Sequence, residues 1–472
     1  MMSSNTVVLL TLIGYKLLLL GIGFWASKRV KSEADFFIAG KGEGQGLGAW
    51  TAGLSYAAST SSAWVLLGYT GLVFSKGLVA LWLIPGIFSG YVLTWLVMGP
   101  RLNAETEERG HLTIVDFITG DVGEKWRRII GIVCALMILF CFVFYISSQF
   151  QAAGNALTSV FGINSTEAIL LGATIIVIYC LLGGFWAASI TDALQAAVML
   201  LACVLVPVMA VVNAGGFGNI MSALQADQAP AYFSLTGGVT GMVGTGVALG
   251  LLGTGLGALG QPQLLNRIMA TKDAKTRRQG AAITIGWGMI IYTGLTLLAL
   301  TAKSLALDVD GEHLFFEAAE AFLPAVLAGV VIAAVLSAVM STVDSLLLAA
   351  ASAVSHDMGL EYNSPKKALL FGRIAMVGVA VLAVLLTLYL PKDIFSRVLF
   401  SWVALGAAFG PTILTRCLGW HVKGGFVLTA IVAGFAIAVY SANQSSVSAD
   451  MFEKWVSWIV GMLILFAGRR RA

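Results

Sequence analysis

The sequence has few charged residues. Asp, Glu, Lys and Arg together make up 11% of its 472 positions, whereas hydrophobic residues make up 58%. That balance excludes a soluble globular protein and predicts a helical protein embedded in a lipid bilayer. Proline is also scarce, with 9 residues against 54 glycines, and abundant glycine is typical of closely packed membrane helices.

Cysteines are also few, and common catalytic motifs are absent. The 5 cysteines lie in or beside apolar runs, without the spacing of metal ligands or of a disulfide framework. The sequence also has no nucleophile elbow and no HExxH motif. We therefore expect that the protein is not an enzyme.

Apolar segments of membrane-spanning length occur along the whole chain. We count about thirteen of them, at residues 6–26, 48–75, 79–99, 127–160, 165–182, 184–213, 237–261, 279–302, 323–354, 368–390, 395–415, 424–443 and 453–468. No soluble domain is expected, so residues 1–472 should form a single membrane transport domain of all-α class.

The basic residues predict how these spans lie in the membrane. With the N-terminus outside, most Lys and Arg fall in inner loops, chiefly within 28–41, 101–128, 267–278 and 469–471. This asymmetry predicts a multi-pass protein of the plasma membrane, the bacterial inner membrane, with a cytoplasmic C-terminus. Because topology alone explains the basic clusters, we expect no nucleic-acid partner.

Two spans contain stretches that should interrupt a helix. Residues 51–64 bring small and hydroxyl side chains into the second span, and residues 250–262 bring several glycines into the seventh. Interrupted helices five spans apart predict an inverted repeat with its site at mid-membrane. We assign the repeats to residues 48–213 and 237–415, with peripheral helices at 6–26 and 424–468. The alternative is that the small residues only let helices pack closely.

The ninth span carries a polar turn within an apolar run. Ala338, Ser341 and Thr342 lie on one helical face, and Asp344 and Ser345 follow directly. Hydroxyl and carbonyl oxygens gathered in this way suit a small hard cation. The alternative is that the hydroxyls only bond back to their own helix.

Several motifs, taken in order, resemble the sodium:solute symporter family, most closely its sodium/proline symporter branch. They are Asp35–Lys41, Gly183–Phe185 leading to Asp192, Gly257–Pro262, Ala338–Thr342 and Gly406–Pro411. The resemblance covers almost the whole chain. It implies a LeuT-like fold, with one helix before an inverted five-helix repeat and two after it, and Na+ as the coupling ion.

The resemblance also implies positions for the sodium ligands. They are the backbone oxygens of Ala58 and Ser61 together with Ala338, Ser341 and Thr342. Helix ends and hydroxyls would then supply partial charge without a full carboxylate, which suits a site that must release its ion.

A second cation position follows from the same resemblance. Some members bind another sodium between an Asp at the Asp192 position and hydroxyls at the Ser341 and Ser345 positions. Because Asp344 adds a carboxyl, we expect Asp192, Asp344 and Ser345 to hold either a second sodium ion or a proton. A structural hydrogen bond from Asp192 to Thr191 or Ser345 is the alternative.

The solute pocket should lie between the two broken spans and the fourth and eleventh spans. By resemblance we expect its lining to include Ser62, Trp64, Tyr145, Thr254, Ala258 and Trp402. The sequence departs from the proline branch here, because residues 59–64 lack that branch's acidic residue. Thr254 and Ala258 also stand where that branch has Trp and Tyr, so the pocket should be roomier. Packing is the alternative role for Trp64 and Tyr145.

Together these features predict a secondary active symporter. Inward sodium flow would drive import of a small organic solute, an amino acid such as proline, by alternating access. The alternative is a transporter-like sensor that reports solute occupancy to a separate signalling partner. The sequence leaves the solute, the sodium stoichiometry and the oligomeric state open.

Overall fold

A computed structural model describes residues 4–27, 37–38, 46–182, 184–359, 365–390, 393–444 and 450–470. Most of these residues are helical. The only β pairings among them are two isolated bridges, Leu47 with Thr271 and Val422 with Arg469. Most of the Asp35–Lys41 motif, as well as Gly183, lies outside the described residues.

Every predicted span falls on one helix or on consecutive helical segments. In chain order the segments are α1 (Ser4–Ser27), α3 (Ala49–Thr60), η1 (Trp64–Tyr69), α4 (Thr70–Lys76), η2 (Gly77–Trp82), α5 (Leu83–Val92), η3 (Leu93–Met98), α6 (Gly99–Arg109), α7 (Ile114–Thr119), α8 (Glu124–Phe161), α9 (Ser165–Leu182), α10 (Phe185–Asn213), α11 (Phe217–Asp227), η4 (Pro230–Phe233), α12 (Gly241–Leu252), η5 (Gly253–Gly260), α13 (Pro262–Met269), α14 (Ala274–Ser304), α15 (Leu314–Phe322), α16 (Ala325–Ser352), η6 (Ala353–Asp357), α17 (Pro365–Tyr389), α18 (Ile394–Cys417), α19 (Gly424–Ala442), η7 (Phe452–Val456) and α21 (Ser457–Ala467).

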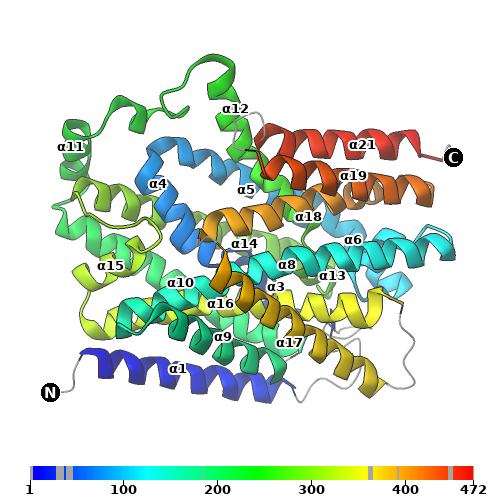
Figure 1. The fold of residues 1–472 in the computed structure, drawn as a ribbon, viewed down its shortest axis with the longest axis horizontal. Coiled ribbons are helices and arrows are strands. Elements are labelled where there is room, and N and C mark those ends of the chain that lie inside the picture. The colour runs from blue at the N-terminus through cyan, green and yellow to red at the C-terminus, as the bar shows by residue number, and fades with distance from the viewer. Residues whose placement is uncertain are drawn as a thin grey trace.

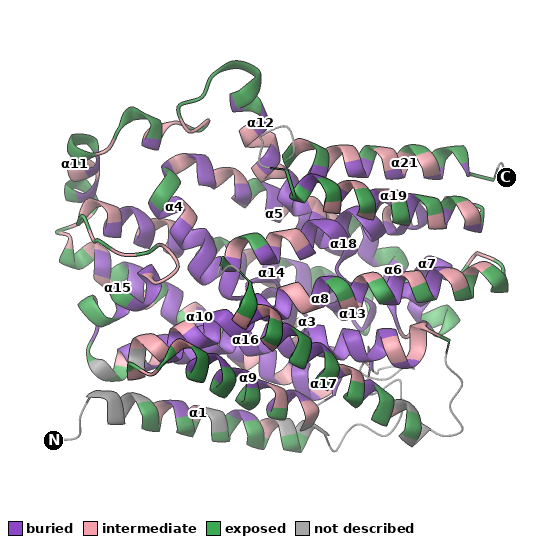
Figure 2. Ribbon diagram, viewed as in Figure 1, coloured by how far each residue is buried: buried purple, intermediate pink, exposed green. Residues whose placement is uncertain are grey.

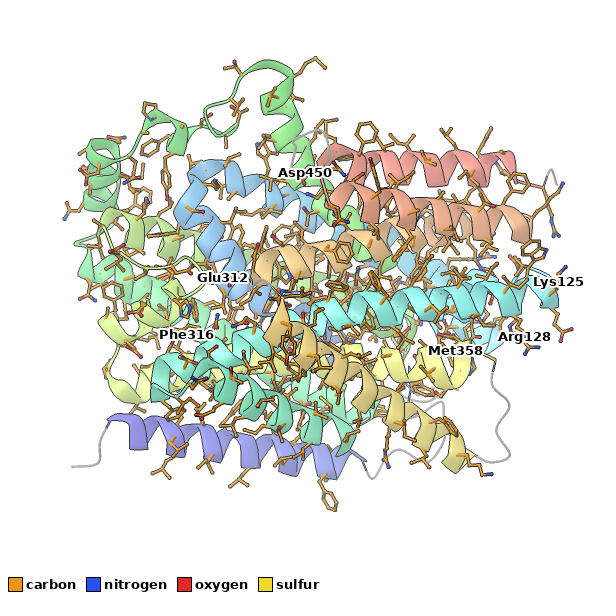
Figure 3. The ribbon with its side chains drawn as sticks, in the orientation of Figure 1. Lys125, Arg128, Glu312, Phe316, Met358 and Asp450 are labelled. Carbon is orange, nitrogen blue, oxygen red and sulfur yellow. The ribbon has the colours of Figure 1, made fainter. Side chains whose placement is uncertain are left out.

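The long helices form a bundle whose two ends carry the two termini. In Figure 1 the helices run across the view, with the N-terminus at the left and the C-terminus at the right. Figure 3 places Lys125 and Arg128 at the right end, and Glu312 and Phe316 toward the left. In the described ranges, nine helical stretches are long and apolar enough to cross a membrane.

Burial separates the inner helices from the outer ones. In the most apolar stretches of α16 and α18, 83% of residues are buried, against 28% in α17. Figure 2 shows the same pattern, with exposed residues gathered on α1 and α17 and buried ones in the middle of the bundle. The exposed side chains of α17 are largely apolar, among them Leu370, Ile374 and Leu382. Such a surface is stable against lipid rather than water.

The second span is interrupted, as the sequence predicts. Helix α3 ends at Thr60, Ser61 leaves helical geometry at φ −95° and ψ 59°, and η1 begins at Trp64 as a π-helical turn. The Thr60 hydroxyl donates to the Tyr56 carbonyl at 2.7 Å. Local hydroxyl bonds of this kind compete with the helical ladder, so the chain can leave the helix here.

The seventh span is interrupted in the same way. Helix α12 ends at Leu252, η5 continues as a tighter 3₁₀ segment, and Gln261 is extended before α13 starts at Pro262. Glycine lowers helix stability, and proline suits the first turn of a new helix. The glycine-rich sequence therefore unwinds where it is predicted to.

The packing of the inner helices brings the two interruptions to one region. Helix α10 packs against both α3 and α16, and α13 contacts α3 and α16 as well. Helix α18 lies along η5 and also contacts η1. Polar groups from both breaks thus face the same inner helices, where they are shielded from lipid.

Candidate functional site

The polar turn of α16 lies against the break after α3. The Ser341 hydroxyl reaches the Ala58 carbonyl at 3.4 Å and the Ala338 carbonyl at 3.2 Å. Thr342 Oγ1 donates to the same Ala338 carbonyl at 2.9 Å. Ser61, at the break itself, has a fully buried hydroxyl without a hydrogen-bond partner. Four of the five residues predicted to hold the first sodium ion, Ala58, Ala338, Ser341 and Thr342, therefore lie in contact, and Ser61 follows Ala58 at the end of α3.

These hydroxyls do bond back to their own helix, which was the alternative explanation. A hydroxyl that donates its hydrogen still has two lone pairs free, so it can also coordinate a cation. The Ala58 carbonyl, in contrast, belongs to another helix, α3, and faces the Ser341 hydroxyl. The cluster is thus an arrangement between two helices and not only local capping.

Next to this turn, a buried arginine joins four elements. The guanidinium of Arg267, on α13, donates from Nη2 to Asp192 Oδ2 at 2.7 Å and to Ser345 Oγ at 2.5 Å. Its Nε donates to Ser55 Oγ at 2.6 Å, and Ser55 Oγ donates to Asp192 Oδ2 at 2.7 Å. Arg267 is only 1% exposed. The predicted second cation position therefore already contains a positive charge.

Asp344 completes this group. Its Oδ1 accepts a hydrogen bond from Ser345 at 3.2 Å, whereas its Oδ2 is buried without a partner. Asp192 Oδ1 is likewise buried and unpartnered. The Asp192 carboxylate thus pairs with the guanidinium directly, whereas Asp344 is linked to it only through Ser345, and each carboxyl has one oxygen without a partner.

The structure changes two sequence-based interpretations in this group. The sequence places Arg267 among the basic loop residues that set topology, but in the structure it lies inside the protein, because α13 packs against α3 and α16. Asp192 bonds to neither Thr191 nor Ser345 directly. Thr191 donates instead to the carbonyls of Ala187 and Ala188.

The predicted solute-binding residues fall into two groups. In the first, the Ser62 hydroxyl accepts from Tyr145 at 3.4 Å, from Gln149 at 3.3 Å and from the Trp64 amide at 3.4 Å. The Trp64 indole turns back and donates to the Thr60 carbonyl at 3.0 Å. A polar group at the first break therefore faces α8.

The second group lies at the other break. The Trp402 indole donates to the Thr254 carbonyl at 2.9 Å, and the Thr254 hydroxyl is buried without a partner. Ala258 packs against Gly90 of α5, where an added Cβ would lie 3.2 Å from its methyl group. The Trp402 indole therefore contacts the second break, whereas Ala258 faces α5.

Sequence reasoning missed a set of tyrosines on α5 and α14. The hydroxyls of Tyr91 and Tyr292 are buried and unpartnered, like that of Ser61. Tyr69 packs edge-on against Tyr292, with ring centroids 5.1 Å apart. Unpaired buried hydroxyls are costly unless a ligand or water meets them. The available signal was the presence of tyrosines within otherwise apolar spans.

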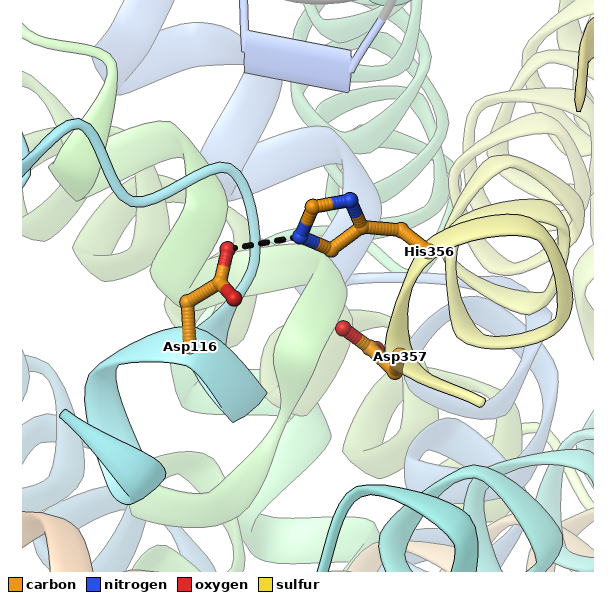
Figure 4. A group of neighbouring side chains, drawn as sticks. All are labelled: Asp116, His356 and Asp357. Atoms are coloured by element: carbon orange, nitrogen blue, oxygen red, sulfur yellow. Dashed lines mark hydrogen bonds and ion pairs between the residues drawn. The ribbon is translucent and has the colours of Figure 1, made fainter. Parts of the chain in front are cut away.

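A separate polar cluster lies at the end of the bundle that carries Lys125 and Arg128. His356 Nε2 bonds to Asp116 Oδ2 at 2.9 Å, and Asp357 lies beside them (Figure 4). Asp116 also completes the N-terminal cap of α7 by accepting from the Thr113 amide at 3.3 Å, and it accepts from the Leu112 amide at 2.9 Å as well. Thr113 donates through its hydroxyl to Asp357 at 2.6 Å. Burial would raise the pKa of the Asp116 carboxyl, but His356 and the Leu112 amide hold it well below its ordinary value. The cluster ties α7 to the end of α16.

The architecture and the site together define a class. A bundle built on two interrupted spans, with hydroxyl and carbonyl oxygens at the first break, is the arrangement of a LeuT-like transporter. The chain is similar over 99% of its length, with a TM-score of 0.78, to a Na+-coupled sialic acid symporter solved in a substrate-bound outward-open state. That structure is also covered over 99% of its chain, at 17% identity, so the likeness shows the fold.

Two relatives extend the comparison to sequence. The osmoregulated proline transporter OpuE of Bacillus subtilis is 31% identical, over 95% of this chain and 92% of the relative. The sodium/proline symporter of Escherichia coli is 30% identical, over 92% of this chain and 87% of the relative. Residues 36–421 match the sodium:solute symporter family.

The chain belongs to the sodium:solute symporter family. It is therefore a membrane transport protein, and the prediction that it is not an enzyme is confirmed. Sodium as its coupling ion is confirmed as well.

Proposed function

We propose that the protein imports a small amino acid, such as proline, together with sodium by alternating access. The contact of the Ser341 hydroxyl with the Ala58 carbonyl at 3.4 Å carries this proposal, because it joins the broken helix to α16. An ion held between these two elements would favour one arrangement of the helices over another. Sodium and solute could then each raise the affinity for the other. The relatives described above are named as transporters, and nothing in them favours a sensor.

The sodium ion would be held by Ala58, Ser61, Ala338, Ser341 and Thr342. Their oxygens carry partial negative charges, and all five residues are fully buried. Such ligands bind a monovalent cation without the strong hold of a direct carboxylate, so the ion can leave when the helices separate.

The solute would lie between the two breaks, α8 and α18. Ser62, Trp64, Tyr145, Thr254 and Trp402 are the residues that we assign to it, whereas Ala258, which packs against α5, is left out. The unpartnered hydroxyl of Thr254 offers a hydrogen bond to a polar solute group, and Trp402 fixes the backbone beside it. The name of each relative includes proline, which is therefore the first solute to test, and the small side chain of Thr254 leaves room for other amino acids.

The membrane orientation completes the proposal. The first repeat would comprise residues 48–213 and the second residues 237–415, flanked by 6–26 and 424–468. Lys125 and Arg128 lie at the opposite end of the bundle from Glu312 (Figure 3). Because basic residues gather on the cytoplasmic side, their end and the C-terminus would lie in the cytoplasm, and the N-terminus would lie outside. The membrane would be the bacterial inner membrane, as suits the bacterial relatives.

Uptake into proteoliposomes tests the function. Radiolabelled proline should accumulate under an inward sodium gradient and not under a matched potassium gradient. A panel of unlabelled amino acids, carboxylates and sugars, added as competitors, identifies the preferred solute. Equal uptake in both gradients would contradict sodium coupling.

A further inference from the structure

The polar cluster of Asp116, His356 and Asp357 lies outside the residues that we assign to sodium and to the solute. One imidazole and two carboxyl groups converge there (Figure 4), and their ligand atoms all lie within 4.8 Å of one another. Imidazole nitrogen together with carboxylate oxygen suits divalent transition metals such as zinc, whereas Mg2+ and Ca2+ prefer oxygen ligands alone. Three protein ligands would leave a further coordination position for water.

The helix geometry at the end of α16 brings two adjacent residues to the same place. Ala353–Asp357 form the π-helical turn η6, a local widening of the helix that is frequent at functional sites. Gly131 of α8 lies against this turn, because an added Cβ there would fall 2.5 Å from the Asp357 carbonyl oxygen. The widened turn and the close approach of α8 therefore fix the backbone of His356 and Asp357 beside α7.

Hydrogen bonds from the start of α7 orient the two carboxyl groups. Asp116 Oδ2 accepts from the Leu112 and Thr113 amides at 2.9 and 3.3 Å. The Thr113 hydroxyl donates to Asp357 Oδ1 at 2.6 Å. Outer partners of this kind hold metal ligands in position and raise their affinity for the metal. Arg127 reaches Asp116 Oδ1 at 3.3 Å, but its side chain is 63% exposed, so it can turn into solvent when a cation enters.

A cavity of about 950 Å³ gives access to the cluster from solvent. All three side chains of the cluster line it, together with exposed charged residues of α8, among them Glu124, Lys125 and Arg128. A hydrated ion can therefore reach the imidazole and both carboxyl groups without crossing the core of the bundle. The approach is from the end of the bundle that we assign to the cytoplasm.

We propose that Asp116, His356 and Asp357 bind one divalent transition-metal ion, such as Zn2+. Asp116 belongs to the first repeat, residues 48–213, whereas His356 and Asp357 belong to the second, residues 237–415. The ion therefore bridges the two repeats, a consequence that rests on the proposed function. Because alternating access moves one repeat against the other, an ion bound here slows transport by holding them together.

Binding of Zn2+ alone to the purified protein in lipid nanodiscs tests the site without sodium or solute. Equilibrium dialysis should find one tightly bound Zn2+ per wild-type chain, and an excess of Mg2+ should not displace it. His356→Gln and Asp357→Asn should each weaken binding by roughly tenfold or more, because each removes one ligand. His313→Ala is the matched control, since it removes a histidine beside α15, at the other end of the bundle. Absence of zinc binding in the wild type, or unchanged affinity in both ligand variants, would overturn the proposal.

Uptake into proteoliposomes tests the consequence for transport. Zn2+ on both sides of the membrane should lower sodium-driven uptake several-fold in the wild type and in His313→Ala, but not in His356→Gln. Uptake without zinc shows that a variant is folded, and Asp357→Asn takes the place of His356→Gln if the latter is not. Bound zinc without any loss of uptake would overturn the bridge between the repeats. A wild type that takes up no solute even without zinc would contradict the proposed function, whereas the dialysis result would still decide the metal site.

Discussion

The indole nitrogen of Trp402 on α18 lies 2.9 Å from the carbonyl oxygen of Thr254, to which it donates a hydrogen bond. The same ring covers Gly257, where an added Cβ would fall 1.9 Å from Trp402 Cδ1. The unwound segment of the seventh span and α18 are therefore held together by a hydrogen bond and by close packing. A movement of either one must be accommodated by the other.

Enlarging Gly257 should break this contact. Gly257→Ala forces the Trp402 ring away and should lower the free energy of unfolding by about 1–3 kcal/mol. Thermal unfolding of the detergent-purified protein measures the loss. Gly286→Ala is the matched control, because nothing lies within 4 Å of its added Cβ and it stands within α14. If both variants unfold at the same temperature, the close packing is not as described.

Removing a hydroxyl from the polar turn of α16 should weaken sodium binding. Ser341→Ala and Thr342→Ala should each raise the sodium concentration for half-maximal uptake by roughly tenfold, because each deletes one oxygen ligand. Ser352→Ala removes a hydroxyl from the same helix that only bonds to the Ala349 carbonyl, and it should leave that concentration unchanged. An unchanged sodium dependence in the double variant of Ser341 and Thr342 would contradict the ion site.

Replacing Ser62 should weaken solute binding and leave sodium binding unchanged. Its hydroxyl accepts from Tyr145, Gln149 and the Trp64 amide, so Ser62→Ala removes one acceptor from each of these donors. The KM for the solute should rise by roughly tenfold, while sodium binding measured without solute stays as in the wild type. Thr70→Ala, which removes a buried hydroxyl bonded only within its helix, is the control. A solute KM equal to that of the control would remove Ser62 from the pocket.

Glu312 should make the stability of the protein depend on pH. Burial, aided by the charge of Asp393, raises the pKa of Glu312 to about 7, although its Oε1 accepts from the Ile394 amide at 2.9 Å. A carboxyl whose pKa is raised by folding stabilises the folded state when protonated. Its contribution is therefore complete below the ordinary pKa of 4.5 and is lost as the pH rises through about 7.

The matching variant is Glu312→Gln, which cannot ionise. Between about pH 5 and pH 8 the wild type should lose about 2 kcal/mol of stability relative to this variant. Thermal unfolding at several pH values follows the difference. Parallel pH profiles for the two proteins would show that Glu312 ionises as it does in water.

Much of the architecture could be predicted from the sequence because the signals are local. The scarcity of charge and the length of the apolar runs give the spans, since each run must be long enough to cross the bilayer by itself. The two interruptions follow from hydroxyl and glycine residues that weaken the helix at their own positions. The alignment of Ala338, Ser341 and Thr342 follows from helical geometry alone.

Only the tertiary structure decided which polar groups meet. Arg267 is 75 positions from Asp192, and His356 is 240 positions from Asp116, so no periodicity connects them. Arg267 is one of several basic residues near the end of a span. It is buried only because α13 packs against α3 and α16. Composition and helical period determine where a segment is buried. The charge that a buried carboxylate faces is set by contacts between helices distant in sequence.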